Sequence, residues 1–151
     1  MDLALKAAEN AGKAGEVPIG CVIVLNGEVI AEAGNRTFTD RDPTAHAEMI
    51  AIREACRLSG SERLVDCDLY VTLEPCAMCA GAISHARIGR VVWGADDPKG
   101  GAVIHGPRLF EQPTCHWRPT AEGGVLATES SERLRDFFRA RRAGTPVQTR
   151  R

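Results

Sequence analysis

Two short segments constrain how this chain can fold: Thr-Ala-His-Ala-Glu at 44–48 and Leu-Glu-Pro-Cys-Ala-Met-Cys at 73–79. Together they offer the imidazole of His46 and the thiolates of Cys76 and Cys79, a mixture of nitrogen and sulfur ligands that zinc accepts. Three protein ligands leave a fourth tetrahedral position for water, as in catalytic zinc sites. The fold must therefore bring two distant segments to one point.

The pattern of apolar residues predicts alternating helices and strands. Alanine-rich helical spacing predicts a helix over 2–14, ended by Gly15. Valine- and isoleucine-rich segments flank Asn26-Gly27, which is typical of a type I′ hairpin turn. The predicted strands are 19–25, 28–33, 69–73, 90–95 and 125–127, and the later helices are 44–58, 75–86 and one from about 129 that Thr128 caps. We expect Met49, Ile52 and Cys56, and later Leu134, Phe137 and Phe138, to face the core.

This order of elements predicts one α/β domain over residues 1–151. We expect a three-layer α/β/α sandwich with a central mixed sheet of about five strands, in which the hairpin supplies the antiparallel part. Residues 34–43 are predicted to form a polar loop before the first motif, and 96–124 a long irregular segment with one short helix.

The composition is that of an ordinary globular protein. Of the 151 residues, 44% are hydrophobic and 26% charged, and no apolar run is long enough to suggest a membrane helix. The N-terminus has no signal-peptide pattern. Six cysteines without the spacing of a small secreted domain favour a reducing, cytoplasmic location, with Cys21, Cys56 and Cys67 as small buried hydrophobes.

The net charge of −1 is unevenly distributed. Residues 133–151 contain seven arginines and one acid, Asp136, so this end carries +6 and the preceding part −7. A basic end on an acidic body favours a polyanionic partner, although arginine-rich ends are also often merely solvated.

The two motifs are predicted to meet at the starts of two helices. On an ideal helix His46 and Glu48 point in nearly opposite directions, so a shared site must lie beyond the helix start. Cys76 and Cys79 lie on one face of the first turn of their helix. The positive helix ends favour both thiolates, zinc activates a water, and Glu48 is the candidate proton carrier for a hydrolytic deamination. The alternative is a closed structural site in which Cys115, beside His116, is the fourth ligand.

The combination of His-Ala-Glu with Pro-Cys-Ala-Met-Cys matches the signature of zinc nucleobase deaminases. Nearly the whole chain resembles the tRNA-specific adenosine deaminases of the cytidine deaminase-like superfamily. The segments that carry this resemblance are 16–20 (Glu-Val-Pro-Ile-Gly), 34–36, 42–48, 69–83, 87–95, 97–102 (Asp-Pro-Lys-Gly-Gly-Ala), 124–126, 137–139 and 141–142. Residues 104–119 depart from the family pattern, and His85, His105, Cys115 and His116 receive no role.

The resemblance implies that adenosine is converted to inosine at the first anticodon position of tRNA by a homodimer, with one Zn²⁺ per chain. It implies that His46, Cys76 and Cys79 hold the zinc and that Glu48 carries the proton. It also implies that the substrate contacts are Asn35, which hydrogen-bonds the flipped-out base, Val17, which packs on it, and Asp97 and Lys99, which lie near the flanking nucleotides. The alternatives are that Asn35 stabilises a loop, that Val17 belongs to the core, and that Asp97 and Lys99 are solvated turn residues.

Two other functions remain open. A deaminase of a free base or nucleoside such as guanine or cytosine would use the same zinc chemistry, but it has no need of Arg139, Arg141 and Arg142 near one helix face. A non-catalytic zinc or RNA-binding module has no need of Glu48. Neither rival accounts for both features.

Overall fold

A computed structural model describes residues 1–144 of the chain. Within this range there are five strands, four α-helices and one short 3-10 helix. In chain order they are α1 (Asp2–Lys13), β1 (Gly20–Leu25), β2 (Glu28–Gly34), α2 (Ala47–Ser59), β3 (Cys67–Leu73), α3 (Ala77–His85), β4 (Arg90–Ala95), η1 (Leu109–Glu111), β5 (Thr120–Glu122) and α4 (Ala127–Ala143).

The strands form one mixed sheet in the order β2-β1-β3-β4-β5. β1 is antiparallel to both β2 and β3, whereas β3, β4 and β5 are parallel. The β1–β2 hairpin turns at Asn26 and Gly27, which both have positive φ angles of 52° and 79°. The predicted mixed sheet of about five strands and its antiparallel hairpin are confirmed.

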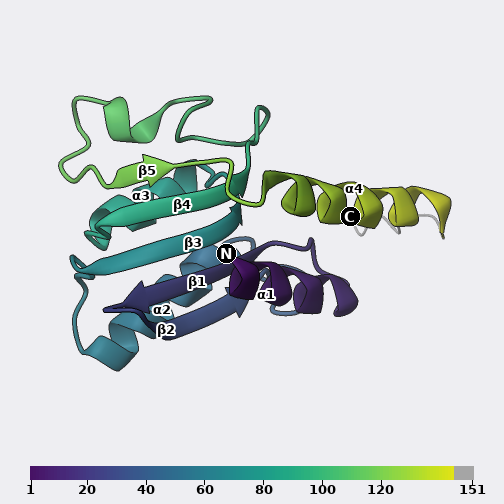
Figure 1. Ribbon diagram of the computed structural model, residues 1–151, viewed down its shortest axis with the longest axis horizontal. Coiled ribbons are helices and arrows are strands. Elements are labelled where there is room, and N and C mark those ends of the chain that lie inside the picture. Colours follow the sequence, from purple (N-terminus) through teal and green to yellow (C-terminus); the bar gives the residue numbers. More distant parts are fainter. Residues whose placement is uncertain (145–151) are drawn as a thin grey trace.

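Helices cover both faces of the sheet. In Figure 1, α1 and α4 lie on the near face and α2 and α3 on the far face. The main core lies between the sheet and the α2–α3 layer, where Ile23, Leu69, Ile83 and Ile88 are fully buried. β3 and β4 are parallel and are connected by α3. Because they are parallel, their carboxyl ends lie at the same edge of the sheet. Glu74 and Pro75 leave β3 at this edge and lead directly into α3.

Small residues allow α1 to lie directly on the sheet. The buried face of α1 is made of Leu5 and four alanines. Gly20, at the start of β1, faces this helix, and a Cβ there would overlap the carbonyl oxygen of Ala4. Only glycine fits this approach without moving the helix, so α1 and β1 are held at a fixed short distance.

The last strand is not where the apolar residues predict it. The segment 125–127 was expected to be a strand, but β5 is Thr120–Glu122, whose three residues are all exposed. An exposed edge strand has no alternation of buried and polar residues, so its sequence gives little signal. Val125 and Leu126 are instead half-buried in the turn that joins the sheet to α4, where the N–H of Val125 donates to the Trp93 carbonyl.

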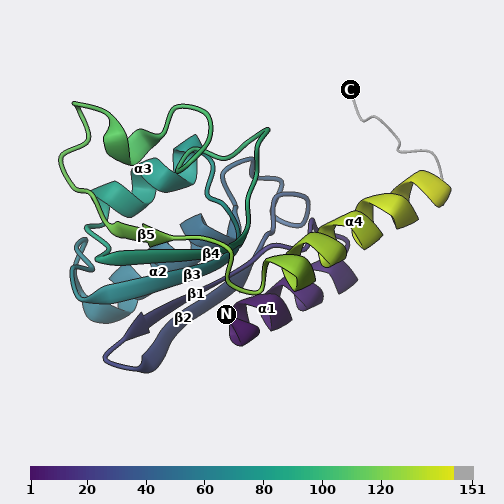
Figure 2. The same cartoon turned by 45° about the horizontal axis from the view of Figure 1, so that its top comes forward.

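Two predictions about α4 are wrong. Leu126, in the left-handed region, is the N-cap residue, so Thr128 lies within the first turn and does not cap the helix. Leu134 and Phe137 are half-buried, but Phe138 is 44% exposed and only Ser130 is buried. The inner half of α4 lies alongside α1, and its outer half extends beyond the sheet and the end of α1, so the outer half has no core to face (Figure 2). Over residues 1–144, no helix is long and apolar enough to cross a membrane.

Candidate active site

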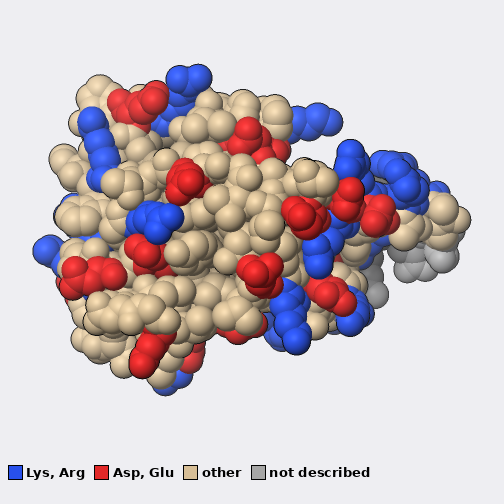
Figure 3. All heavy atoms as spheres, in the orientation of Figure 1, with Lys and Arg blue, Asp and Glu red and all other residues tan. Residues whose placement is uncertain are grey.

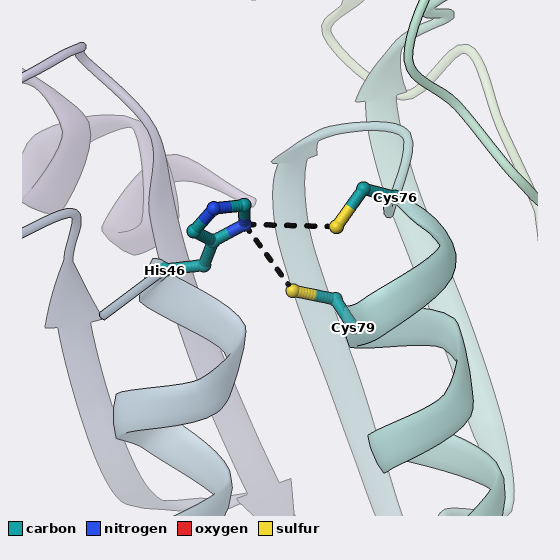
Figure 4. Close-up of side chains that lie close together, drawn as sticks. All are labelled: His46, Cys76 and Cys79. Carbon is teal, nitrogen blue, oxygen red and sulfur yellow. Dashed lines mark hydrogen bonds between the residues drawn. The ribbon is translucent and has the colours of Figure 1, made fainter. Parts of the chain in front are cut away.

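The starts of α2 and α3 meet at one point. His46 is the N-cap residue of α2 and Cys76 is the N-cap residue of α3, and both have extended backbone angles. Cys79 follows in the first turn of α3. Figure 4 shows the three side chains facing one another between the two helix starts. α2 begins at Ala47, three residues later than predicted, so His46 lies directly before its first residue.

The three side chains have the spacing of a zinc site. Nδ1 of His46 lies 3.6 Å from Sγ of Cys76 and 3.5 Å from Sγ of Cys79. The three atoms lie within 4.8 Å of one another. Tetrahedral zinc, with bonds of about 2.0–2.1 Å to nitrogen and about 2.3 Å to sulfur, separates such atoms by about 3.6 Å. The residues therefore fit zinc without rearrangement.

Only one of the two cysteines is held as a thiolate by its protein surroundings. A hydrogen bond from the Cys79 thiol, followed by one from His46, lowers the pKa of Cys76 to about 4. The same bond with Cys76, together with burial, raises the pKa of Cys79. Two thiolates this close repel each other, and a cation between the sulfur atoms would favour release of the second proton.

Glu48 lies in the first turn of α2 and is 4% exposed. Burial raises its pKa to about 7, and the nearby charge of Cys76 adds to this effect. The charges of Cys76 and His46 act on its pKa, so the carboxyl group lies near the candidate ligands. Buried carboxyl groups are rare unless they have a partner or a function.

Asn35 contacts the start of α2, and Val17 lies in the segment between α1 and β1. Asn35 directly follows β2 and is 7% exposed, and its Oδ1 accepts a hydrogen bond of 2.8 Å from the backbone N–H of Ala47. Its Oδ1 therefore stabilises the start of α2. Val17 is half-buried in the segment between α1 and β1, so it is neither fully core nor fully exposed.

Asp97 and Lys99 lie in the loop after β4. The Asp97 carboxylate accepts the backbone N–H groups of Lys99 and Gly100 at 3.2 Å and 3.0 Å, which makes a tight turn. Asp97 is half-buried and Lys99 is exposed. Asp97 therefore closes a turn from which the cationic side chain of Lys99 extends into solvent.

Sequence reasoning missed Glu74, which fixes this loop. Its side chain is fully buried, and it accepts hydrogen bonds from the backbone N–H groups of Asp97, Val103, Ile104 and His105 at 3.1–3.2 Å. The His105 ring adds a fifth bond at 2.7 Å. The available signal was a carboxylate directly at the end of an apolar strand, where burial requires hydrogen-bond partners.

Glu16 has the same function on the other side of the site and was also missed. It is 1% exposed, and it accepts hydrogen bonds from the backbone N–H groups of Phe38 at 3.1 Å and Thr39 at 2.7 Å, and from the Thr39 hydroxyl at 2.6 Å. Glu16, which directly precedes Val17, therefore holds the loop between Asn35 and His46 in place.

Cys115 does not belong to the zinc site. Its thiol lies 3.5 Å from Oγ of Ser84 and donates to the Trp117 carbonyl at 3.2 Å. Ser84 is near the far end of α3, about 12 Å along the helix from Cys76 at 1.5 Å per residue. This position rules out Cys115 as a fourth ligand beside His46, Cys76 and Cys79.

Comparisons with known proteins agree with this geometry. Residues 1–95 match the cytidine and deoxycytidylate deaminase zinc-binding region. The chain is 59% identical over 142 residues to the tRNA-specific adenosine deaminase of Agrobacterium fabrum, covering 94% of this chain and 93% of that protein.

Solved structures give the same relationship. A structure from a study of A-to-I editing by tRNA:A34 deaminases at the wobble position superposes with a TM-score of 0.87 at 59% identity, covering 89% of this chain and 97% of that one. A guanine deaminase from Bacillus subtilis superposes with a TM-score of 0.63 at 34% identity, covering 96% and 92%. The chain therefore belongs to the cytidine and deoxycytidylate deaminase family and, within it, to the tRNA-specific adenosine deaminases.

Proposed function

We propose that this protein is a zinc-dependent deaminase that converts adenosine to inosine at the first anticodon position of tRNA. The observation that carries the proposal is the 59% identity to a tRNA-specific adenosine deaminase over 94% of the chain. The meeting of His46, Cys76 and Cys79 beside Glu48 supplies the matching chemistry. These three residues hold one zinc ion, and Glu48 is the proton carrier.

The reaction adds water to the ring carbon that bears the amino group and releases ammonia. Bound zinc supplies a Lewis acid that lowers the pKa of a water. The Glu48 carboxylate takes a proton from the water and delivers it to the ring nitrogen next to the reacting carbon. It then transfers the second proton to the departing amino group, so that the carbon–nitrogen bond breaks as the new carbonyl forms.

The base is held by Asn35 and Val17. The Oδ1 of Asn35 is engaged by the Ala47 N–H, which leaves the Asn35 amide NH₂ to donate to an acceptor on the base. Val17 packs its half-buried side chain against the ring. Asp97 and Lys99 approach the flanking nucleotides from the loop after β4, where Lys99 offers an exposed cation.

A basic surface supports RNA as the substrate. The described part of α4 contains Arg133, Arg135, Arg139, Arg141 and Arg142. Figure 3 shows Lys and Arg side chains over α4 where it extends from the body of the molecule, with some Asp and Glu side chains among them. Phosphate contacts from such a helix would make binding dependent on salt. Arg150 and Arg151, at the predicted basic tail, lie outside the described residues.

We further propose a homodimer in the cytoplasm, as the resemblance to the family implies. One side of α3 packs on the sheet through Cys79, Ala80 and Ile83. The other side lines an open cleft of about 230 Å³ with Leu109 and Trp117, which leaves this helix accessible to a second chain. Sedimentation of the purified protein tests the assembly.

One substrate comparison tests the function. The zinc-loaded protein is incubated with an anticodon stem-loop that has adenosine at its first anticodon position, and separately with free adenosine, guanine and cytosine. We expect inosine in the stem-loop and much slower turnover of the free compounds. Because a guanine deaminase shares 34% identity with this chain, faster turnover of guanine would replace the tRNA assignment with that activity.

A further inference from the structure

The C-terminal helix contacts the body of the protein again near its outer end. Although only Ser130 of α4 is buried, Arg141 returns to the end of α1, where its Nη2 donates a hydrogen bond of 2.6 Å to the carbonyl of Gly15. Gly15 has a positive φ angle of 87° and directly precedes Glu16 and Val17. One guanidinium therefore connects α4 to the segment that leads into the proposed base pocket.

The same guanidinium lies over two aromatic rings. Its Cζ atom is 5.2 Å from the ring centroid of Phe38 and 4.7 Å from that of Phe137. Both distances are within the range in which a cation is attracted to the face of an aromatic ring. Phe38 is 58% exposed, and Arg141 contacts its ring from a helix distant in sequence.

Phe38 lies in the loop that joins the end of β2 to the start of α2. The loop begins at Asn35 and ends at His46, and its ends are tied by the N–H of Arg36, which donates to the Ala45 carbonyl at 2.9 Å. Glu16 holds the loop through the N–H groups of Phe38 and Thr39. Movement at Phe38 therefore passes through a short, hydrogen-bonded loop to Asn35.

We infer that Arg141 is a positioning residue that fixes the loop between Asn35 and His46, so that the C-terminal helix sets the position of the base-binding amide. This inference rests on the function proposed above. Arg141 contacts Phe38, which lies in the loop that follows Asn35, and Gly15, which lies two residues before Val17. It therefore acts on both proposed base-binding residues through their neighbours. A guanidinium is suited to this role because it can donate to a carbonyl while its flat face lies on a ring, which an ammonium group does less well.

The competing role for Arg141 is a plain phosphate contact. That role needs only the positive charge, so lysine should preserve it, and alanine should lower the salt dependence of RNA binding by about 0.7–0.9 in the slope of log K against log salt. A positioning role needs the guanidinium itself, and it should leave that slope unchanged. Arg142, the neighbouring exposed arginine on α4, provides the comparison for a phosphate contact.

The experiment compares Arg141→Lys, Arg141→Ala, Phe38→Leu and the Arg141→Ala/Phe38→Leu double variant with the zinc-loaded wild type and Arg142→Ala. Single-turnover rates at saturating anticodon stem-loop and salt titrations of RNA binding are measured. For both Arg141 variants we expect the rate to fall about tenfold with the salt slope unchanged, because a hydrogen bond and a cation–π contact are lost together. The double variant should be no slower than the slower single variant, since the two residues act as one unit.

Hydrogen exchange of the free protein gives a second readout that does not require activity. The amides of residues 38–42 all donate hydrogen bonds within the loop or to Glu16. In both Arg141 variants these amides should exchange faster, while those of β1 and β3 remain as in the wild type. Arg142→Ala should leave the loop amides unchanged.

Three results would overturn the inference: a wild-type rate in Arg141→Lys, a reduced salt slope in Arg141→Ala, or loop exchange equal to the wild type in both variants. Failure of the proposed function is a different result. In that case the wild type itself would not deaminate the stem-loop, whereas the exchange of the loop amides would still report whether Arg141 fixes the loop.

Discussion

The carboxylate of Glu74 accepts a hydrogen bond of 2.7 Å from Nδ1 of His105, across 31 residues of sequence. Glu74 is two residues before Cys76 and has no exposed side-chain surface. Hydrogen bonds from His105 and from the backbone lower its pKa despite burial, so it is held as an anion. One buried charge thus connects the start of α3, where the candidate zinc ligands Cys76 and Cys79 lie, to the loop that carries Asp97 and Lys99.

Replacing Glu74 should be much more damaging than replacing His105. Glu74→Ala leaves four backbone N–H groups, one buried and three partly buried, without their acceptor, and we expect the free energy of unfolding to fall by at least about 3 kcal/mol. His105→Ala removes one bond from a carboxylate that keeps four others, so it should cost about 1–2 kcal/mol. Urea unfolding measures both variants, with the exposed His85→Ala as a control expected within about 0.5 kcal/mol of the wild type. Equal losses for Glu74→Ala and His105→Ala would contradict this account.

The stabilisation that Glu16 provides should be lost in acid. Although burial opposes it, the hydrogen bonds from Thr39, Phe38 and Thr37 lower the pKa of Glu16 below its ordinary value of 4.5. Its stabilisation is therefore complete above the unfolded pKa and is lost as the pH falls through the lower folded pKa. Glu16→Gln should cost about 1–3 kcal/mol at pH 7.

Urea unfolding of the wild type and Glu16→Gln at several pH values between 7 and about 3 checks this prediction. The difference between the two proteins should shrink towards the acid end, because the wild-type carboxylate becomes protonated there. A difference that is the same at all pH values would show that the charge of Glu16 does not stabilise the loop.

Catalysis and zinc binding should separate in single variants. Glu48→Gln keeps all three candidate ligands, so zinc content should stay at about one per chain while the deamination rate falls by at least about 10². Cys76→Ala should lose zinc and lower the melting temperature, because the site holds the starts of two helices together. Cys115→Ala is the matched control, since this thiol binds the Trp117 carbonyl and should leave the zinc content unchanged. Zinc loss in Cys115→Ala, or activity in Glu48→Gln, would overturn these roles.

The zinc residues were predictable because their chemistry is local. The motif residues lie at the starts of two helices that the apolar pattern also predicts, and side-chain type and spacing were sufficient to place them together. Glu16 and Glu74 were not predictable in the same way. Most of their hydrogen-bond donors are backbone N–H groups, at 38–39 for Glu16 and at 97 and 103–105 for Glu74, and a backbone donor has no side-chain identity that a sequence can reveal.

The errors in the fold have related causes. The exposed strand β5 gains its stability from pairing with β4, not from burial of its own side chains, so apolar residues misplace it to 125–127. Phe138 shows the converse error, because an apolar residue with helical spacing was assigned to a core that the outer half of α4 does not have. Periodicity predicts which face of a helix is apolar, but contacts between elements decide whether that face is covered.

The last prediction concerns the packing of α1 on the sheet. At Gly20 a Cβ would overlap the Ala4 carbonyl oxygen and the Ala8 backbone nitrogen, and neither atom can move without moving the helix. Gly20→Ala should therefore lower the free energy of unfolding by about 1–3 kcal/mol, the usual cost of overpacking. Gly81, within α3, has open space around its Cα, so Gly81→Ala should stabilise the single chain by up to about 1 kcal/mol through helix propensity. Urea unfolding of the two variants distinguishes a steric need for glycine from a permissive one, and a stable Gly20→Ala variant would show that α1 can shift away from β1.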